Sequence, residues 1–176
     1  MLFNITQNIY GWLKLSLNNL LPINLVGNSM EGIYNYLKIS DSIATAGQPT
    51  KEQFGSVKDS GYDVIVNLAL PISANALPDE KQIVESQGME YVHIPVIWEN
   101  PTLEDVEQFF DVMEANTDKK VFVHCAANMR VSAFIYLYRR IHEGISDEEA
   151  KEDLHHIWKP NENWQKFIER AIEHYK

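Results

Sequence analysis

Short, nearly continuous apolar runs alternate with amphipathic helical patterns along most of the chain, and this alternation limits the folds available to it. The clearest runs are YDVIVNLAL at 62–70 and KKVFVHC at 119–125. Such runs are typical of strands that are buried on both faces of a parallel sheet. Segments 42–47 and 90–96 also have strand-like sequences, and 35–40 alternates apolar and polar residues. The sequence therefore predicts about five strands.

Helical patterns fill the segments between these strands. Thr50 and Gln53 have the spacing of a capping box, as do Thr102 and Asp105. Because strands and helices alternate, the sequence predicts an α/β fold: a single domain with a central, mostly parallel sheet of about five strands flanked by helices. Helices are expected at 50–60, 77–88, 103–113, 128–143 and 161–175, with another that begins at Ser146.

The first 26 residues carry one charge, Lys14, and several asparagines interrupt their apolar stretch. The stretch is therefore too polar to span a bilayer, whereas its leucines and isoleucines recur at helical spacing. We divide the chain into an amphipathic N-terminal segment, 1–30, and one domain, 31–176. We expect the segment to pack on its own domain or to mediate self-association. A surface-membrane anchor and a poor secretory signal are the alternatives.

The charge and the cysteine count exclude several classes of function. The formal net charge of −10 argues against nucleic acid or an anionic membrane as the main partner. The single cysteine forbids an intramolecular disulfide and a zinc site built from several cysteines. A lone thiol fits a reducing cytosol, so we expect a cytoplasmic location, with the periplasm or a membrane surface as alternatives. No dinucleotide or nucleoside-triphosphate motif is present, and we expect no cofactor.

Cys125 stands at the predicted carboxyl end of a strand, which is where open α/β folds bind ligands. The backbone N–H groups of 126–131 can surround an anion, and the helix that follows points its positive end at the same place. This environment favours the thiolate form of Cys125. Arg130 offers a planar fork for anion oxygens, and Ser132 could donate a hydrogen bond to the sulfur. The structural alternative is a buried cysteine beside a surface arginine.

The segment VFVHCAANMRVSAF, 121–134, resembles the signature loop of cysteine-dependent protein tyrosine and dual-specificity phosphatases. Residues 33–142 more closely resemble a bacterial phosphatase-like family named after its beta-lactamase-hydrolase-like fusions, through IATAGQPTKEQF, GYDVIVNLAL and GMEYVHIPVIWENPT. The resemblance implies hydrolysis of a phosphate monoester, carried by a phosphorylated small molecule or a phosphoprotein, without a metal. The thiolate of Cys125 would attack phosphorus, and water would then hydrolyse the cysteinyl-phosphate.

The same resemblance assigns roles to residues around the cysteine. An acid must protonate the leaving oxygen, and Glu99, in the segment IPVIWENPT, is our candidate. Glu104 and Asp105 are explained by the helix dipole instead. We expect His124 to orient the loop rather than to bind a metal. The predicted catalytic residues are Cys125, Arg130 and Glu99. The predicted substrate-binding residues are His124, Ala126, Ala127, Asn128, Met129, Val131 and Ser132.

The loop departs from the phosphatase pattern in its spacing. Phosphatase loops place the arginine one residue further from the cysteine than Arg130 is from Cys125. With Cys125 and Ser132 held in register, Val131 occupies the usual arginine position and Asn128 replaces a usual glycine. Three interpretations stay open: a catalytic phosphatase loop, a rhodanese-like sulfurtransferase loop, which has this shorter spacing, and a non-catalytic pseudophosphatase that binds an anion or a protein.

Overall fold

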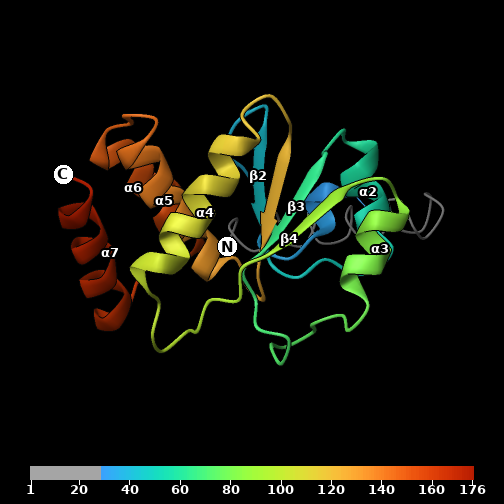
Figure 1. Cartoon of the computed structure of the whole chain (residues 1–176), viewed down its shortest axis with the longest axis horizontal. Helices are drawn as coiled ribbons and strands as arrows, with labels where there is room; N and C mark the ends of the chain where they lie inside the picture. Colours follow the sequence, from blue (N-terminus) through green and yellow to red (C-terminus); the bar gives the residue numbers. More distant parts are fainter. Residues whose placement is uncertain (1–28) are drawn as a thin grey trace, which may run out of the picture.

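The computed structural model describes residues 29–176 (Figure 1). The amphipathic helix predicted near the N-terminus lies outside the described residues. Within residues 29–176, no helix is both long enough and apolar enough to cross a membrane. The elements are η1 (Met30–Gly32), β1 (Leu37–Lys38), β2 (Ile43–Ala46), α2 (Gln53–Asp59), β3 (Val64–Asn67), α3 (Glu80–Ser86), β4 (Glu90–His93), α4 (Leu103–Ala115), β5 (Val121–His124), α5 (Met129–Ile141), α6 (Asp147–Ile157) and α7 (Glu162–His174).

One five-stranded sheet forms the centre of the domain, with the strand order β1-β2-β5-β3-β4. The last four strands in this order are mutually parallel, and β1 pairs antiparallel with β2. The register aligns Asn67 of β3 with His124 of β5 and with His93 of β4. The predicted fold class, a single α/β domain with a mostly parallel sheet of five strands, is confirmed. The carboxyl ends of the parallel strands therefore meet at one edge.

Helices cover both faces of the sheet, as Figure 1 shows: α2 and α3 lie on one side and α4 to α7 on the other. Side chains alternate along a strand, so β5 contributes to both layers. Val121 and Val123 pack in the core beneath α4 to α7, whereas Phe122 packs with α2 and α3. His124 points to the same side as Phe122, where Phe54 of α2 contacts its ring edge-on. Cys125 returns to the core beneath α4 to α7.

The capping box predicted at Thr102 and Asp105 is present. Thr102 and Asp105 exchange side-chain-to-backbone hydrogen bonds of 3.1 and 2.9 Å at the start of α4. Thr50 and Gln53 also exchange hydrogen bonds, but α2 begins only at Gln53, with Glu52 as its N-cap, so Thr50 does not cap this helix.

The strand predicted at 35–40 is shorter than expected, since only Leu37–Lys38 pairs. Asn35 has a left-handed φ of 51°, so the strand cannot begin as early as residue 35. The chain turns again directly after Lys38 to reach β2.

Candidate active site

The cysteine loop, residues 125–128, connects the carboxyl end of β5 to the N-terminus of α5. Cys125 is almost fully buried, with 1% of its surface exposed. Its backbone N–H donates to the Ala46 carbonyl at the end of β2, 3.3 Å away. The N–H of Leu68, just after β3, donates to the His124 carbonyl at 2.9 Å. The strands on both sides of β5 therefore fix the point at which the loop starts.

Asn128 holds the middle of this loop in place. Its φ of 64° is left-handed, a conformation that asparagine tolerates better than most residues and glycine adopts freely. Its amide donates to the Asn35 carbonyl at 2.8 Å and to Thr45 Oγ1 at 2.9 Å. The Asn35 amide in turn donates to the Ala127 carbonyl at 3.0 Å. Asn128 therefore supplies the backbone geometry of a glycine and adds side-chain anchors.

The loop and the first turn of α5 present unpaired backbone donors. The N–H groups of Ala126, Ala127, Met129, Arg130 and Val131 have no hydrogen-bond acceptor within residues 29–176. We call these five N–H groups the anion nest. The first N–H groups of a helix have no acceptor within the helix, and the first turn carries partial positive charge. The anion nest is therefore suited to bind a negatively charged group beside Cys125.

Arg130 is a buried cation next to these donors. Only 8% of its surface is exposed, and within the described residues its guanidinium has no carboxylate partner; the buried Nε has no acceptor there. A positive charge at a helix N-terminus is unfavourable unless an anion compensates it. The guanidinium lies over the ring of Trp98, 5.6 Å from the ring centroid. Val131, in contrast, is fully buried in the apolar core.

Glu99 lies on the loop that brings Trp98 to Arg130. This loop follows β4 and stays beside β3, because the Val96 N–H donates to the Leu68 carbonyl at 3.2 Å. The side chain of Glu99 is exposed, and it makes no hydrogen bond or ion pair with the rest of residues 29–176. Its carboxyl group therefore has no partner among these residues, and its role as the acid stays a prediction.

The C-terminal helices hold the Trp98 loop in place. The ring of Trp98 lies 5.2 Å from that of Trp158 and 5.1 Å from that of Trp164, between ring centroids. Trp164 Nε1 also donates to the Trp98 carbonyl at 3.1 Å, and the Asn163 amide donates to the Glu99 carbonyl at 3.2 Å. Helix α7, which carries Asn163 and Trp164, lies outside the segment that resembled a known family, and it supports the loop with the candidate acid.

Ser132 does not make the hydrogen bond that the sequence suggested. Its Oγ donates to the Met129 carbonyl at 3.0 Å and accepts from Trp158 Nε1 at 3.0 Å. The expectation that this hydroxyl donates to the sulfur is wrong in this arrangement, because the i−3 carbonyl of the same helix takes its proton. Ser132 instead links the first turn of α5 to the tryptophans.

His124 is held by a buried carboxylate that the sequence analysis did not single out. Its Nε2 lies 3.0 Å from Glu80 Oε1, and neither side chain is appreciably exposed. The amides of Gln48 and Asn67 donate to the same carboxylate at 2.5 and 2.8 Å. Burial raises the pKa of Glu80, but the hydrogen bonds from His124 and Gln48, together with the charge that His124 carries when it is protonated, outweigh burial, and the net pKa lies below the ordinary value.

Sequence reasoning missed Glu80 because an acid in the first turn of a helix already has an explanation in the helix dipole. Asn67 did leave a signal, since it is the one strongly polar residue within the apolar run 64–70. Trp98 and Asn35 carried no signal, because only the folded chain brings them to the cysteine loop.

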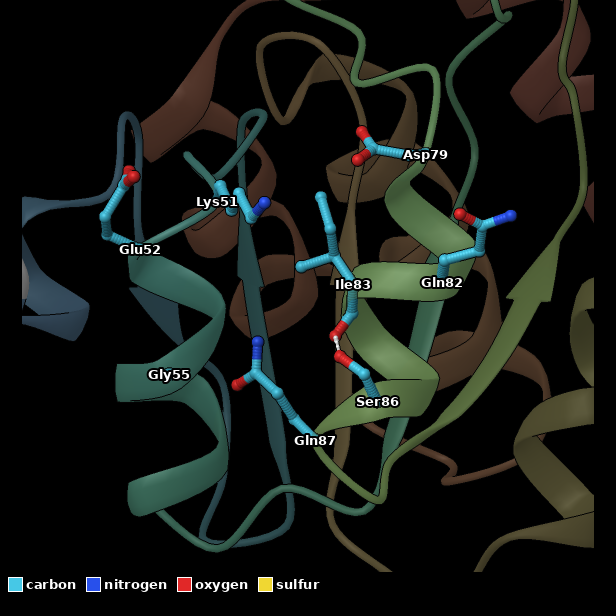
Figure 2. A pocket seen from close by; sticks show the side chains of 8 residues that line it. All are labelled: Lys51, Glu52, Gly55, Asp79, Gln82, Ile83, Ser86 and Gln87. Carbon is cyan, nitrogen blue, oxygen red and sulfur yellow. Dashed lines mark hydrogen bonds between the residues drawn. The ribbon is translucent and has the colours of Figure 1, made fainter.

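A separate groove of about 540 Å³ lies between α2 and α3 (Figure 2). Figure 2 shows Ile83 between the two helices, with Ser86 Oγ bonded back to the Ile83 carbonyl of the same helix. Charges of both signs, from Lys51, Glu52 and Asp79, surround it. The groove shares no residue with the cysteine loop, and we assign it no role in the chemistry.

The fold and the cysteine loop define a domain of the cysteine-phosphatase type. A family model described as "DSP-PTPase phosphatase fused to NAD+ Kinase" matches residues 17–170, and the chain belongs to this family. A beta-lactamase hydrolase-like protein from Xylella fastidiosa strain Temecula1 is 27% identical over 121 residues, which are 67% of this chain. The match spans only 28% of that relative's length. The resemblance deduced from the sequence is confirmed, and family and fold indicate a phosphatase.

Solved structures agree with this assignment. A protein from Shewanella putrefaciens CN-32, described as a candidate phosphatase (DUF442), is 36% identical, with a TM-score of 0.75 over 83% of this chain and 96% of that chain. Two more distant structures share the fold. The first is Tk-PTP, with 19% identity and a TM-score of 0.68 over 79% of this chain and 97% of that chain. The second is the catalytic core of the S. cerevisiae PP-IP phosphatase SIW14, with 14% identity and a TM-score of 0.67 over 79% of this chain and 86% of that chain.

Proposed function

We propose that this protein is a cysteine-dependent phosphatase that hydrolyses a phosphate monoester, borne by a small molecule or a phosphoprotein. One observation carries the proposal: a buried arginine without a counter-ion in the described chain stands beside five backbone donors without acceptors. Both support the binding of an anion with several oxygens, because each offers donors or positive charge to the same place. A phosphoryl group is such an anion, and Cys125 is the nucleophile at the base of the same loop.

The proposed reaction has two steps. In the first, the Cys125 thiolate attacks phosphorus, an S–P bond forms, and the P–O bond to the leaving group breaks. Glu99 gives its proton to the leaving oxygen. In the second, water attacks phosphorus, the S–P bond breaks, and Glu99 takes a proton from that water. The anion nest and Arg130 stabilise the charge on the equatorial oxygens in both steps.

The short spacing between Cys125 and Arg130 leaves sulfur transfer and simple anion binding as rivals, and one set of assays separates them. The wild type should release phosphate from an aryl phosphate such as p-nitrophenyl phosphate. Cys125→Ser should release none while it still binds phosphate. If the wild type transfers sulfur from thiosulfate to cyanide faster than it releases phosphate, it is a sulfurtransferase. If it binds phosphate but catalyses neither reaction, the loop is an anion-binding site only.

A further inference from the structure

Five polar side chains form a closed network on the α2–α3 side of the cysteine loop. Gln48, Asn67, Glu80, Tyr91 and His124 come from five different segments of the chain, four of them at or just after a strand of the sheet. The Glu80 carboxylate accepts hydrogen bonds from Gln48, Asn67 and His124, and the Asn67 amide also donates to the Tyr91 hydroxyl at 3.1 Å. A cavity of about 340 Å³ after β3 and β4 borders the network, and Lys81 and His93 also line it.

A buried carboxylate is costly unless its partners compensate its charge. Only 3% of Glu80 is exposed, and its surroundings are otherwise apolar, with Phe54 and Phe122 against the ring of His124. The charge of Glu80 is therefore not part of the solvent-exposed surface, so it does not contribute to solubility. Every partner of Glu80 is a donor, and the most deeply buried of them is the histidine that directly precedes Cys125.

The same contacts determine which nitrogen of His124 carries its proton. An ionised carboxylate only accepts hydrogen bonds, so Nε2 must donate to Glu80. Nδ1 is buried and has no partner among residues 29–176. An orphaned acceptor is tolerated better in a protein interior than an orphaned N–H. The geometry therefore favours a neutral ring with the proton on Nε2 and the lone pair on Nδ1.

We propose that Glu80 is a positioning residue: through His124, it fixes the tautomer and orientation of the residue at which the cysteine loop begins. The inference rests on the proposed function for its effect on turnover. Neighbouring strands hold the backbone of His124 and Cys125, but only Glu80 holds the imidazole by a hydrogen bond within the described chain. Without it, only packing against Phe54 and Phe122 would hold the ring, and its tautomer would no longer be fixed. We expect the start of the cysteine loop to be less well ordered as a result. Active-site geometry tolerates errors of only about 0.5 Å.

Glu80→Gln is a suitable test because the network can accept it. Gln48 Oε1 is buried and has no partner within residues 29–176. A half-turn of the Gln48 amide would let this oxygen accept from the new amide. The remaining oxygen of the variant is neutral, so it accepts from His124 Nε2 more weakly than the carboxylate does. We expect the variant to fold, and its kcat to decrease by about 10-fold to 100-fold, as when the outer partner of a metal-bound histidine is removed. KM for the aryl phosphate should change by less than the kcat.

Tyr91→Phe is the matched control. It removes one hydroxyl from the network but leaves the carboxylate and its bond to His124 intact. We expect it to lower the thermal midpoint without a comparable loss of kcat. A double variant completes the test, because Glu80 acts through His124: Glu80→Gln should cost little further kcat once His124→Gln is present. If the two changes multiply, or if Tyr91→Phe loses as much kcat as Glu80→Gln, Glu80 is merely structural.

A spectroscopic measurement decides the inference even if the protein hydrolyses no phosphate. Long-range ¹H–¹⁵N NMR distinguishes histidine tautomers, and His124→Gln assigns the His124 signals among the six histidines. The wild type should show a single tautomer of His124 with the proton on Nε2, and Glu80→Gln should show a shift toward mixed or Nδ1-protonated forms. A wild-type ring with its proton on Nδ1, or a spectrum unchanged by Glu80→Gln, would overturn the inference. A failure of phosphate release with the expected tautomer would overturn only the proposed function.

Discussion

The guanidinium of Arg130 lies over the indole ring of Trp98, 5.6 Å from the ring centroid. The contact joins the first turn of α5 to the loop that carries Glu99, and it is the only charged contact of Arg130 with another side chain in the described chain. An aromatic face attracts a cation but leaves its N–H groups free at the ring edge. Trp98 can therefore hold the arginine in place without competing with an anion for its hydrogen bonds.

Trp98→Ala should weaken phosphate binding, because Arg130 loses the surface that orders it. A partly desolvated cation–π contact contributes about 1–2 kcal/mol, or roughly 5-fold to 30-fold in the inhibition constant of inorganic phosphate. Trp98→Phe keeps a ring face and should lose less. Inhibition of aryl phosphate hydrolysis by phosphate measures both variants. Equal inhibition constants for the wild type and Trp98→Ala would show that the stacking does not position Arg130.

Asn128 should be replaceable by glycine more easily than by alanine. Asn128→Gly keeps the left-handed conformation and loses only the bonds to Asn35 and Thr45, whereas Asn128→Ala loses those bonds and adds backbone strain. We expect the alanine variant to be less stable than the glycine variant by about 1 kcal/mol, measured by urea denaturation. An alanine variant as stable as the glycine variant would contradict the assignment of strain to this position.

Moving the arginine to the usual phosphatase position should damage the protein. Val131 is fully buried in the apolar core, so Arg130→Ala, Val131→Arg places an unpaired charge there. We expect a loss of folding free energy of about 3 kcal/mol or more and no gain in activity. Arg130→Lys, which keeps the charge but not the planar fork, should fold normally and bind phosphate less tightly. A shifted arginine that folds and outperforms the wild type would show that the short spacing is a defect.

Glu80 should contribute a pH-dependent part of the stability. Its pKa in the folded protein lies below the ordinary value of 4.5, so the unfolded chain takes up a proton at a higher pH than the folded chain does. The stabilisation is complete above about pH 4.5 and is lost as the pH falls through the lower folded pKa. Glu80→Gln should therefore lose less stability between pH 5 and pH 3 than the wild type, in urea titrations. If the unfolding free energies of the two proteins fall equally between pH 5 and pH 3, the assignment is contradicted.

The sequence alone was sufficient for the architecture and for the place of Cys125 in it. The apolar runs 62–70 and 119–125 and the caps at Thr102 and Ser146 depend on local periodicity and local hydrogen bonds, which neighbouring residues determine. Cys125 could be found because the carboxyl end of a buried strand is a fixed place in an α/β sheet.

The environment of the loop could not be derived in the same way. Glu80 is 44 residues from His124, and Trp98 is 32 residues from Arg130, so no local pattern links them. Contacts between residues so far apart in the sequence depend on how the helices and strands pack in the folded protein. The direction of the Ser132 hydroxyl was wrong for a related reason: a backbone carbonyl three residues earlier is closer than any distant acceptor. The role of Glu99 stays a prediction, since its side chain makes no hydrogen bond or ion pair with the part of the chain that the structure describes.

The central claim is that Cys125 carries the phosphoryl group during turnover, and trapping that intermediate tests it most directly. The wild type is mixed with a rapidly hydrolysed aryl phosphate, denatured within the first turnover, and mapped by peptide mass spectrometry. We expect one phosphoryl group on the peptide that contains Cys125, no such adduct in Cys125→Ala, and slower formation in Arg130→Ala. Release of phosphate without any adduct on Cys125, or an adduct on a different residue, would contradict the account.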